Sequence, residues 1–331
     1  MSSKIHKTTK EVQLEKANAA LRQKLTDLQG AIATDEELLD DLKDYIVTLD
    51  PPKFKVVLGV DGQPVTAVLL LSDWHVGEYI DVEMVEGTNT YDLEVAGRRV
   101  RLLCSKFCNW IAESLRPINE IRILVLGDMI SGNIHKELIA TNECPVPAQI
   151  VEAANLLSEL IANISGLGIP VGVDFITPDN HSRRSKKYQF KEAGQNSDNF
   201  LVGVITRLKL SSCVDFRIWH QIYKRIEVGR CAYLCGHGHT VKGWAGFPYY
   251  GIDRFVAKES WVRMQEDNGG FDKLCLGHWH VPMHSVKYNI GGSLSGTNEL
   301  DHACGRFSHP CQVAWLIHPD HGEYAWLEFW V

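Results

Sequence analysis

Five short polar clusters interrupt the apolar runs of this 331-residue chain, and each cluster directly follows a run that predicts a β-strand. The clusters are Ser72-Asp73-Trp74-His75, Gly127-Asp128, Asp179-Asn180-His181, Gly236-His237-Gly238-His239 and Gly277-His278-Trp279-His280. In open α/β sheets, ligands bind at the edge formed by the carboxyl ends of the strands. The sequence therefore predicts that strands far apart in the chain bring these side chains to one rim.

From about residue 54, short β-branched runs alternate with stretches of helical periodicity, which indicates a layered α/β domain. The dipeptide Asp61-Gly62 predicts a hairpin turn between the first two strands. The predicted strands span residues 56–60, 65–71, 121–126, 171–176, 213–219, 231–235, 273–276 and 313–317, and the predicted helices span residues 93–115, 148–164 and 200–208.

The N-terminal region differs from the rest, because residues 8–49 contain no proline and carry a heptad pattern of apolar side chains. The d and a positions are occupied by Leu14, Asn18, Leu21, Leu25, Leu28 and Ile32. An Asn at an a position can set the register of a parallel dimer. This narrow seam therefore fits a homodimer, and it fits equally a helix packed on its own globular domain.

A second N-terminal helix is predicted by Thr34-Asp35-Glu36-Glu37, which has the pattern of a capping box. Pro51-Pro52 ends that helix. We therefore predict a helical extension over residues 1–52, with a possible coiled coil, and a catalytic domain over residues 53–331.

Composition excludes several classes of protein. No apolar run approaches the roughly 20 residues of a membrane span, and the N-terminus lacks the apolar core of a signal peptide, which predicts a cytoplasmic protein without a membrane partner. The 9 cysteines form no Cys-x-x-Cys pair, so reduced thiols are expected. With a net charge of −7 the chain has no global positive field, and a site for a polyanion must be local.

The histidines at the strand ends indicate a metal site. A chain of this composition is expected to contain the string Gly-His-x-His about 0.05 times, yet the string occurs twice. Asp, Asn and His together form a mixed oxygen and nitrogen ligand set, which suits Mn²⁺, Fe²⁺, Zn²⁺ or Ni²⁺ better than Ca²⁺. There are more ligands than one ion needs, so we expect two divalent ions that share one carboxylate and clamp a phosphoryl group.

Taken in order, the clusters Asp-x-His, Gly-Asp, Asn-His, His and Gly-His-x-His resemble the calcineurin-like metallophosphoesterase superfamily over about residues 66–318. The flanking strings SDWHVGE, GDMISGNIHKEL, NHSRRSKK and GGSLSGTNEL resemble its phage-encoded branch, which is often grouped with double-strand-break-repair nucleases. A phage-encoded protein would act in the host cytoplasm. The resemblance implies a four-layer α/β sandwich, in which two mixed β-sheets are flanked by helices, and hydrolysis of phosphate esters by a metal-bridging hydroxide.

The resemblance also implies a role for each matching residue. One metal would be held by Asp73, His75 and His280, the second by Asn180, His237 and His278, and both by the bridging Asp128. The two ions would be Mn²⁺, with Fe²⁺, Zn²⁺, Ni²⁺ or Mg²⁺ as alternatives. His181 would not bind metal and would act on the phosphate or the leaving group.

The chain departs from the family pattern at two positions. Asp179 stands where the third motif has Gly, and Asp tolerates the turn conformations that favour Gly. Ser131 stands where the phosphatase branch has the acid that orients the catalytic histidine. His181 is therefore expected to lack a carboxylate partner.

Several neighbouring residues have two interpretations. His239 could replace His237 as a ligand, although the family pattern favours His237. Arg183 opens a basic run beside His181 and is expected to grip a phosphate, whereas the alternative is a solvated loop. Trp74 and Trp279 could stack on a nucleobase, but walls of the pocket or core positions are the favoured interpretation.

Three functional hypotheses follow. The first is a dinuclear phosphodiesterase or nuclease that acts on DNA or another nucleic acid. The second is a phosphatase or phosphodiesterase for small nucleotides, which the acidic composition favours. The third is a non-catalytic binding module that keeps the fold, although such modules usually lose ligands and every ligand position is filled here.

Overall fold

The computed structural model of the chain describes residues 9–48, 62–134, 136–210, 214–243, 248–265 and 269–331. The chain divides into two units, Met1–Gly59 and Val60–Val331. The predicted strand at 56–60, its hairpin turn and the predicted domain boundary after residue 52 all involve residues 49–61, which lie outside the described residues.

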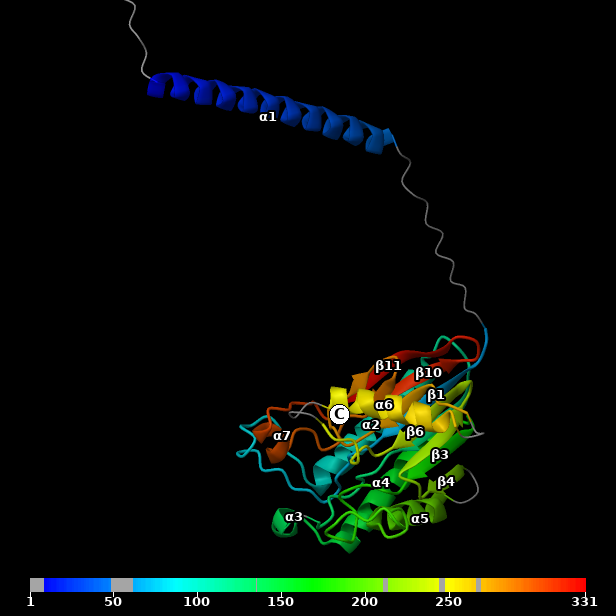
Figure 1. Cartoon of the computed structure of the whole chain (residues 1–331). Coiled ribbons are helices and arrows are strands. Elements are labelled where there is room, and N and C mark those ends of the chain that lie inside the picture. The colour runs from blue at the N-terminus through cyan, green and yellow to red at the C-terminus, as the bar shows by residue number, and fades with distance from the viewer. Residues whose placement is uncertain (1–8, 49–61, 135, 211–213, 244–247, 266–268) are drawn as a thin grey trace, which may run out of the picture. The chain divides into compact units, whose positions relative to one another are not determined.

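The described part of the first unit is one helix, α1 (Thr9–Thr48) (Figure 1). The prediction of a second helix starting at Thr34 is wrong, because the hydroxyl of Thr34 donates a hydrogen bond to the carbonyl of Gly30 at 2.9 Å and the helix runs through this position. The seam residues Leu14, Leu21 and Leu28 are all exposed.

The second unit contains a six-stranded sheet with the order β11-β10-β1-β2-β3-β4. Its strands are β1 (Val65–Leu71), β2 (Ile118–Val125), β3 (Val171–Ile176), β4 (Asp215–Trp219), β10 (Cys311–His318) and β11 (Gly322–Trp330). Strands β1 to β4 run parallel to one another, whereas β10 pairs antiparallel with β1 and β11 pairs antiparallel with β10.

Strand β1 is buried on both faces, which explains its unbroken apolar sequence. Alternate side chains of a strand point to opposite faces, so Leu69 lies in the core shared with helices, while Leu70 lies in the core between the sheets. The helical layer consists of α2 (Leu93–Ala112), α4 (Val146–Ser165) and α5 (Asp198–Leu210). Their apolar faces complete the first core.

The second sheet has the order β5-β6-β7-β9-β8. Its strands are β5 (Tyr223–Val228), β6 (Cys231–Gly236), β7 (Lys273–Leu276), β8 (Met283–His284) and β9 (Tyr288–Ile290). Its outer face packs on α6 (Tyr249–Arg263), where Ile252 joins Leu234 and Leu274 in a third core cluster. The order helices, sheet, sheet, helix confirms the predicted four-layer fold with two mixed sheets.

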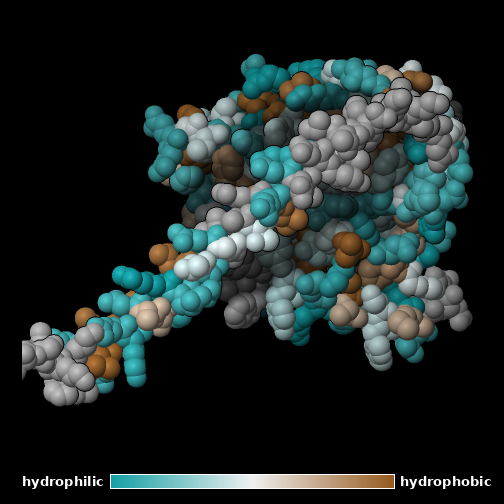
Figure 2. Space-filling view, turned by 90° about the horizontal axis from the view of Figure 1, so that it is seen from above, coloured by the Kyte–Doolittle hydropathy of each residue, from teal (hydrophilic) through white to brown (hydrophobic). Residues whose placement is uncertain are grey.

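Two short helices complete the described elements, α3 (Lys136–Thr141) and α7 (Glu299–Ala303). Among the described helices, none combines the length and the hydrophobicity that crossing a membrane requires. The face drawn in Figure 2 is mostly hydrophilic, with apolar side chains lying among hydrophilic ones.

Candidate metal centre

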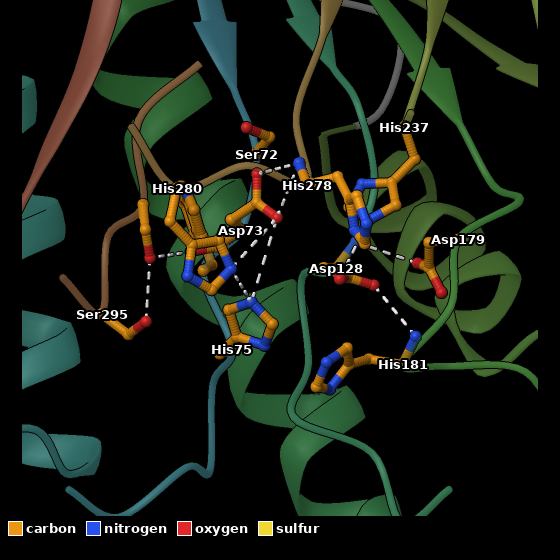
Figure 3. Close-up of polar contacts among 12 residues, drawn as sticks. Ser72, Asp73, His75, Asp128, Asp179, His181, His237, His278, His280 and Ser295 are labelled. Atoms are coloured by element: carbon orange, nitrogen blue, oxygen red, sulfur yellow. Dashed lines mark hydrogen bonds and ion pairs between the residues drawn. The ribbon is translucent and has the colours of Figure 1, made fainter. Parts of the chain in front are cut away.

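The five polar clusters meet at the carboxyl ends of five strands (Figure 3). Three clusters follow β1, β2 and β3 of the first sheet, and two follow β6 and β7 of the second. The loops after β1 and β2 run side by side, because the amides of Asp73 and His75 donate to the carbonyls of Gly127 and Asp128. The predicted rim therefore exists, and both sheets contribute to it.

A first group of ligand atoms comes from Asp73, His75 and His280, which lie within 4.8 Å of one another. The Nε2 atoms of the two histidines are 3.2 Å apart. The nearest oxygen of Asp73 is 3.9 Å from Nε2 of His75 and 3.7 Å from Nε2 of His280. Asp73 and His75 are buried, so three lone-pair donors converge on one largely dry point.

A second group comes from Asp128, His237 and His278, again within 4.8 Å. Nε2 of His237 lies 3.0 Å from a carboxylate oxygen of Asp128 and 2.9 Å from the amide oxygen of Asn180. The rings of His237 and His278 are 5.2 Å apart. All four residues that the resemblance assigns to the second metal, the shared carboxylate included, therefore lie together.

Asp128 lies between the two groups. Its Oδ2 faces His237, while His75, Asp128 and His181 form a third set of atoms within 4.8 Å. Oδ1 of Asp128 also accepts a hydrogen bond from the backbone N–H of His181 at 3.1 Å. This is the position that a carboxylate shared by two cations would occupy.

The backbone is strained at these positions. Five of the eight described non-glycine residues with positive φ are members of the two groups, with φ between 49° and 74°: Asp73, His75, Asp128, His278 and His280. Such conformations are costly and collect at functional sites, where the surrounding structure holds them in place.

Two glycines permit the close approach of the clusters. A Cβ atom on Gly277 would lie 2.6 Å from a carboxylate oxygen of Asp73. Gly127 has a φ of +95°, and a Cβ there would lie 3.0 Å from Nδ1 of His237. Both positions therefore exclude larger residues because ligand side chains fill the space.

Hydrogen bonds behind the ligands aim the imidazole rings. Nδ1 of His237 contacts the carbonyl oxygen of Leu126 at 2.9 Å, and Nδ1 of His280 contacts Oδ2 of Asp301 at 2.8 Å. Asp301 in turn pairs with Arg306 at 2.9 Å. Partners of this kind fix the orientation of metal-binding histidines, with Nε2 turned to the metal.

The contact between Asp301 and His280 could not be predicted from the sequence. The only signal is local: Asn298 caps α7 by accepting a hydrogen bond from the N–H of Asp301, three residues later. That pattern predicts a helix start, but it does not reveal that the Asp301 carboxylate faces a histidine 21 residues away.

Asp179, which stands where the motif of the resembling family has Gly, is not among the described residues with positive φ. The turn therefore forms at this position without the left-handed conformation that favours Gly. The buried carboxylate of Asp179 accepts hydrogen bonds from the N–H groups of Asp128 and Ser182, each at 2.9 Å. Burial, together with the nearby Asp128, raises the pKa of Asp179 to about 6.

His181 is oriented by a backbone group. Its Nδ1 lies 2.8 Å from the carbonyl oxygen of Ser131. The main chain of Ser131, the residue that stands where the resemblance expects an acid, makes this contact. His181 thus has the Ser131 carbonyl as an acceptor at Nδ1.

The charges of the site favour cations. Burial alone would raise the pKa of Asp128, but the imidazoles of His237 and His181 hold this pKa well below its usual value. Burial lowers the pKa of both His75 and His278, so these rings are neutral and available as ligands. Nδ1 of His75 is buried without a hydrogen-bond partner among the described residues.

Burial alone would lower the pKa of His237 and His280, but Asp128 raises the pKa of His237 to about 10 and Asp301 raises that of His280 to about 9. At these two rings a bound metal ion would therefore replace a proton.

The remaining predicted residues lie nearby. Nη1 of Arg183 donates to the carbonyl of Asn180 at 2.6 Å, so this guanidinium is tied to the loop that carries a ligand. His239 is not in either ligand group, and its ring is 5.6 Å from that of His237. Trp74 is fully buried, which agrees with a core position, and Trp279 packs on the third core cluster.

No family model and no curated protein matches this chain. Among solved structures, the chain is similar to a protein of Streptococcus pneumoniae described as a predicted phosphoesterase, with 12% identity, a TM-score of 0.31, and coverage of 80% of this chain and 98% of that one. It is also similar to the zinc complex of Vps29 from Entamoeba histolytica, with 13% identity, a TM-score of 0.30, and coverage of 80% and 99%. Vps29 from Cryptosporidium parvum gives 14% identity, a TM-score of 0.32, and coverage of 81% and 99%.

Proposed function

We propose that this chain is a dinuclear metal-dependent phosphoesterase, and specifically a phosphodiesterase or nuclease that acts on DNA or another nucleic acid. The observation that carries the proposal is the position of Asp128 between two groups of ligand atoms. The order of the motifs in the sequence supports the same reaction class, because it resembles the calcineurin-like metallophosphoesterases.

The residues present fit two divalent ions, for which Mn²⁺ is the first candidate. Asp73, His75 and His280 would hold one ion, Asn180, His237 and His278 the other, and Asp128 both. Two ions carry a charge of +4 against −2 from the two aspartates, so the local charge would be about +2. That charge suits a phosphate ester despite the net charge of −7 on the chain.

Bound divalent ions would lower the pKa of an attacking water and neutralise charge on the phosphate oxygens. The protein supplies the remaining functions. The Ser131 carbonyl holds Nδ1 of His181, so Nε2 is the nitrogen through which His181 acts on the leaving oxygen. Asp179 holds the loop of Asp128 through the backbone N–H, which keeps the shared carboxylate in place.

Arg183 is proposed to contact a substrate phosphate. Its contact with the Asn180 carbonyl fixes it beside a ligand, and the next residues continue a basic loop. The alternative function, hydrolysis of small nucleotides, is favoured by the acidic composition. The two differ in salt dependence, which is steep for an enzyme that binds a long nucleic acid and shallow for one that binds a nucleotide.

The experiment is hydrolysis by chelator-stripped protein, with and without added Mn²⁺. The substrates are bis-p-nitrophenyl phosphate, p-nitrophenyl phosphate, and single- and double-stranded DNA. The variants are Asp128→Asn and His181→Ala, with Asp253→Asn on α6, whose side chain is 50% exposed, as the matched control. We expect Mn²⁺ to restore diester and DNA cleavage in the wild type and the control only.

Each other outcome changes the assignment. Turnover of nucleotides or nitrophenyl esters without DNA cleavage would replace the nuclease with the small-nucleotide enzyme. Binding of Mn²⁺ without turnover of any of these substrates would contradict the proposed catalysis and favour a binding module.

A further inference from the structure

A row of aromatic rings leads away from the second ligand group. The ring of His239 lies 5.6 Å from that of His237, the ring of Tyr188 lies 4.6 Å from His239, and the ring of Phe190 lies 5.1 Å from Tyr188. Phe190 at the outer end is 70% exposed. The row therefore connects a metal-ligand candidate with solvent.

Core packing does not explain these rings. Tyr188, Phe190 and His239 belong to none of the three core clusters of the described residues. The hydroxyl of Tyr188 and both ring nitrogens of His239 are buried without a hydrogen-bond partner in the described part of the chain. Buried polar atoms are normally satisfied, and exceptions mark places where a ligand or water binds.

The same segment carries positive charge. Arg183, Arg184, Lys186 and Lys187 lie between His181 and Tyr188, and both lysines are exposed. Arg184 pairs with Asp198 at 2.7 Å, while Arg183 is fixed on the loop of Asn180. Cations followed by aromatic rings, here the half-buried Tyr188 and the exposed Phe190, are the combination that binds a single nucleic-acid strand, with phosphates on the cations and bases on the rings.

We propose that Tyr188 and Phe190 form a stacking platform for a nucleobase adjacent to the phosphate that is cleaved. This inference rests on the proposed function and extends it, since it makes the base, and not only the phosphate, part of the substrate that is recognised. Stacking is tolerant of base identity, so the platform favours nucleic acid over other phosphate esters without selecting a sequence.

The test compares two phosphorothioate-linked oligonucleotides of about eight units, which resist cleavage and match the size of a single-strand site. One is oligothymidylate, and the other carries abasic tetrahydrofuran units on the same backbone. Binding to the full chain with Mn²⁺ is measured by fluorescence anisotropy for Phe190→Ala, Phe190→Trp and a control, Leu115→Ala. Leu115 is 85% exposed and precedes the N-terminal end of β2, whereas the metal centre lies at the C-terminal end of this strand.

We expect Phe190→Ala to weaken binding of oligothymidylate about 10-fold and to leave binding of the abasic strand unchanged. Phe190→Trp should keep wild-type affinity, and Leu115→Ala should change neither affinity. Equal weakening on both strands, or none on either, overturns the platform while the nucleic-acid function stands. If the wild type binds neither strand, the nucleic-acid function itself fails, and the platform fails with it.

Discussion

Strand β1 and helix α1 both carry several leucines, but those of β1 are buried whereas Leu14 and Leu21 of α1 are exposed. All seven residues of β1 are buried, and Leu69 and Leu70 are 0% exposed. In α1, Leu14 is 64% exposed and Leu21 is 63% exposed. The comparison shows that covering layers, and not apolar composition, decide whether a leucine contributes to the fold of a single chain. The apolar sequence of β1 is explained by burial within its own unit, whereas the described part of the first unit contains nothing that covers the seam of α1.

We propose a second copy of the chain as the partner of α1. When the same register is continued along the unbroken helix, Asp35 falls at the next d position, and Leu39 falls at an a position two heptads after Leu25. In a parallel pair, Lys10 at a g position faces Glu15 at the following e position of the other helix, which is an attractive pairing. Asn18 would meet its own copy. We therefore expect a parallel two-stranded coiled coil.

The largest expected effect is the loss of hydrolytic activity in a variant of Asp128 whose oligomeric state does not change. Asp128→Asn removes the shared charge, and we expect the rate of Mn²⁺-dependent hydrolysis of bis-p-nitrophenyl phosphate to fall about 1,000-fold or more. The molar mass from light scattering should not change, because Asp128 lies outside α1. If the variant lost both its activity and its oligomeric state, the claim that the second unit provides activity and α1 provides assembly would be wrong.

The next largest expected effect is on the free energy of unfolding, for which a buried leucine of β1 is compared with an exposed leucine of α1. Leu69→Ala should lower the free energy of unfolding of the second unit by about 2–5 kcal/mol, because a buried side chain leaves a cavity. Leu21→Ala should change it by less than about 0.5 kcal/mol. Tryptophan fluorescence in urea measures this unit selectively, since all 9 tryptophans follow residue 60. Equal effects of the two substitutions would refute the contrast.

Asp301 tests the support behind the metal centre. Asp301→Asn should weaken Mn²⁺ binding about 10- to 100-fold, because His280 loses the charged partner of its Nδ1. Isothermal titration of the chelator-stripped protein measures the affinity, with the exposed Asp320→Asn in the turn after β10 as control. Unchanged affinity would mean that Asp301 serves only the capping of α7.

The smallest effect on activity is expected from the seam. Leu21→Asp combined with Leu25→Asp places charge in the hydrophobic interface, so we expect the mass in solution to fall from two chains to one. Hydrolysis of bis-p-nitrophenyl phosphate should stay within about twofold of wild type. Light scattering on the wild type decides the point, because a single-chain mass there would remove the dimer.

Much of the fold could be predicted because the central strands are continuous apolar runs with both faces buried. Strands β3 and β7 begin and end where the sequence predicts. Strands β5 and β11 could not be found, because edge strands expose one face and mix polar with apolar residues. The helix break predicted at Thr34 failed because a capping pattern competes with continued helix, and nothing local decides between them.

Some residues of the candidate site could likewise be predicted from the sequence, and others could not. Asp73, His75, Asp128 and the later histidines could be predicted because their motifs follow strands directly, and a strand end places a side chain at a known edge. Asp301 could not, because its contact depends on tertiary structure. The contact of Tyr188 with His239 could not be predicted for the same reason, because it forms only when the loops after β3 and β6 meet.

Sharing of Asp128 by two metal ions can be observed by anomalous diffraction from crystals of the full chain grown with Mn²⁺. We expect two anomalous peaks about 3.5–4 Å apart, each within bonding distance of an Asp128 oxygen. One peak would be bound by Asp73, His75 and His280, and the other by Asn180, His237 and His278. A single peak, or peaks that avoid Asp128, would contradict this sharing.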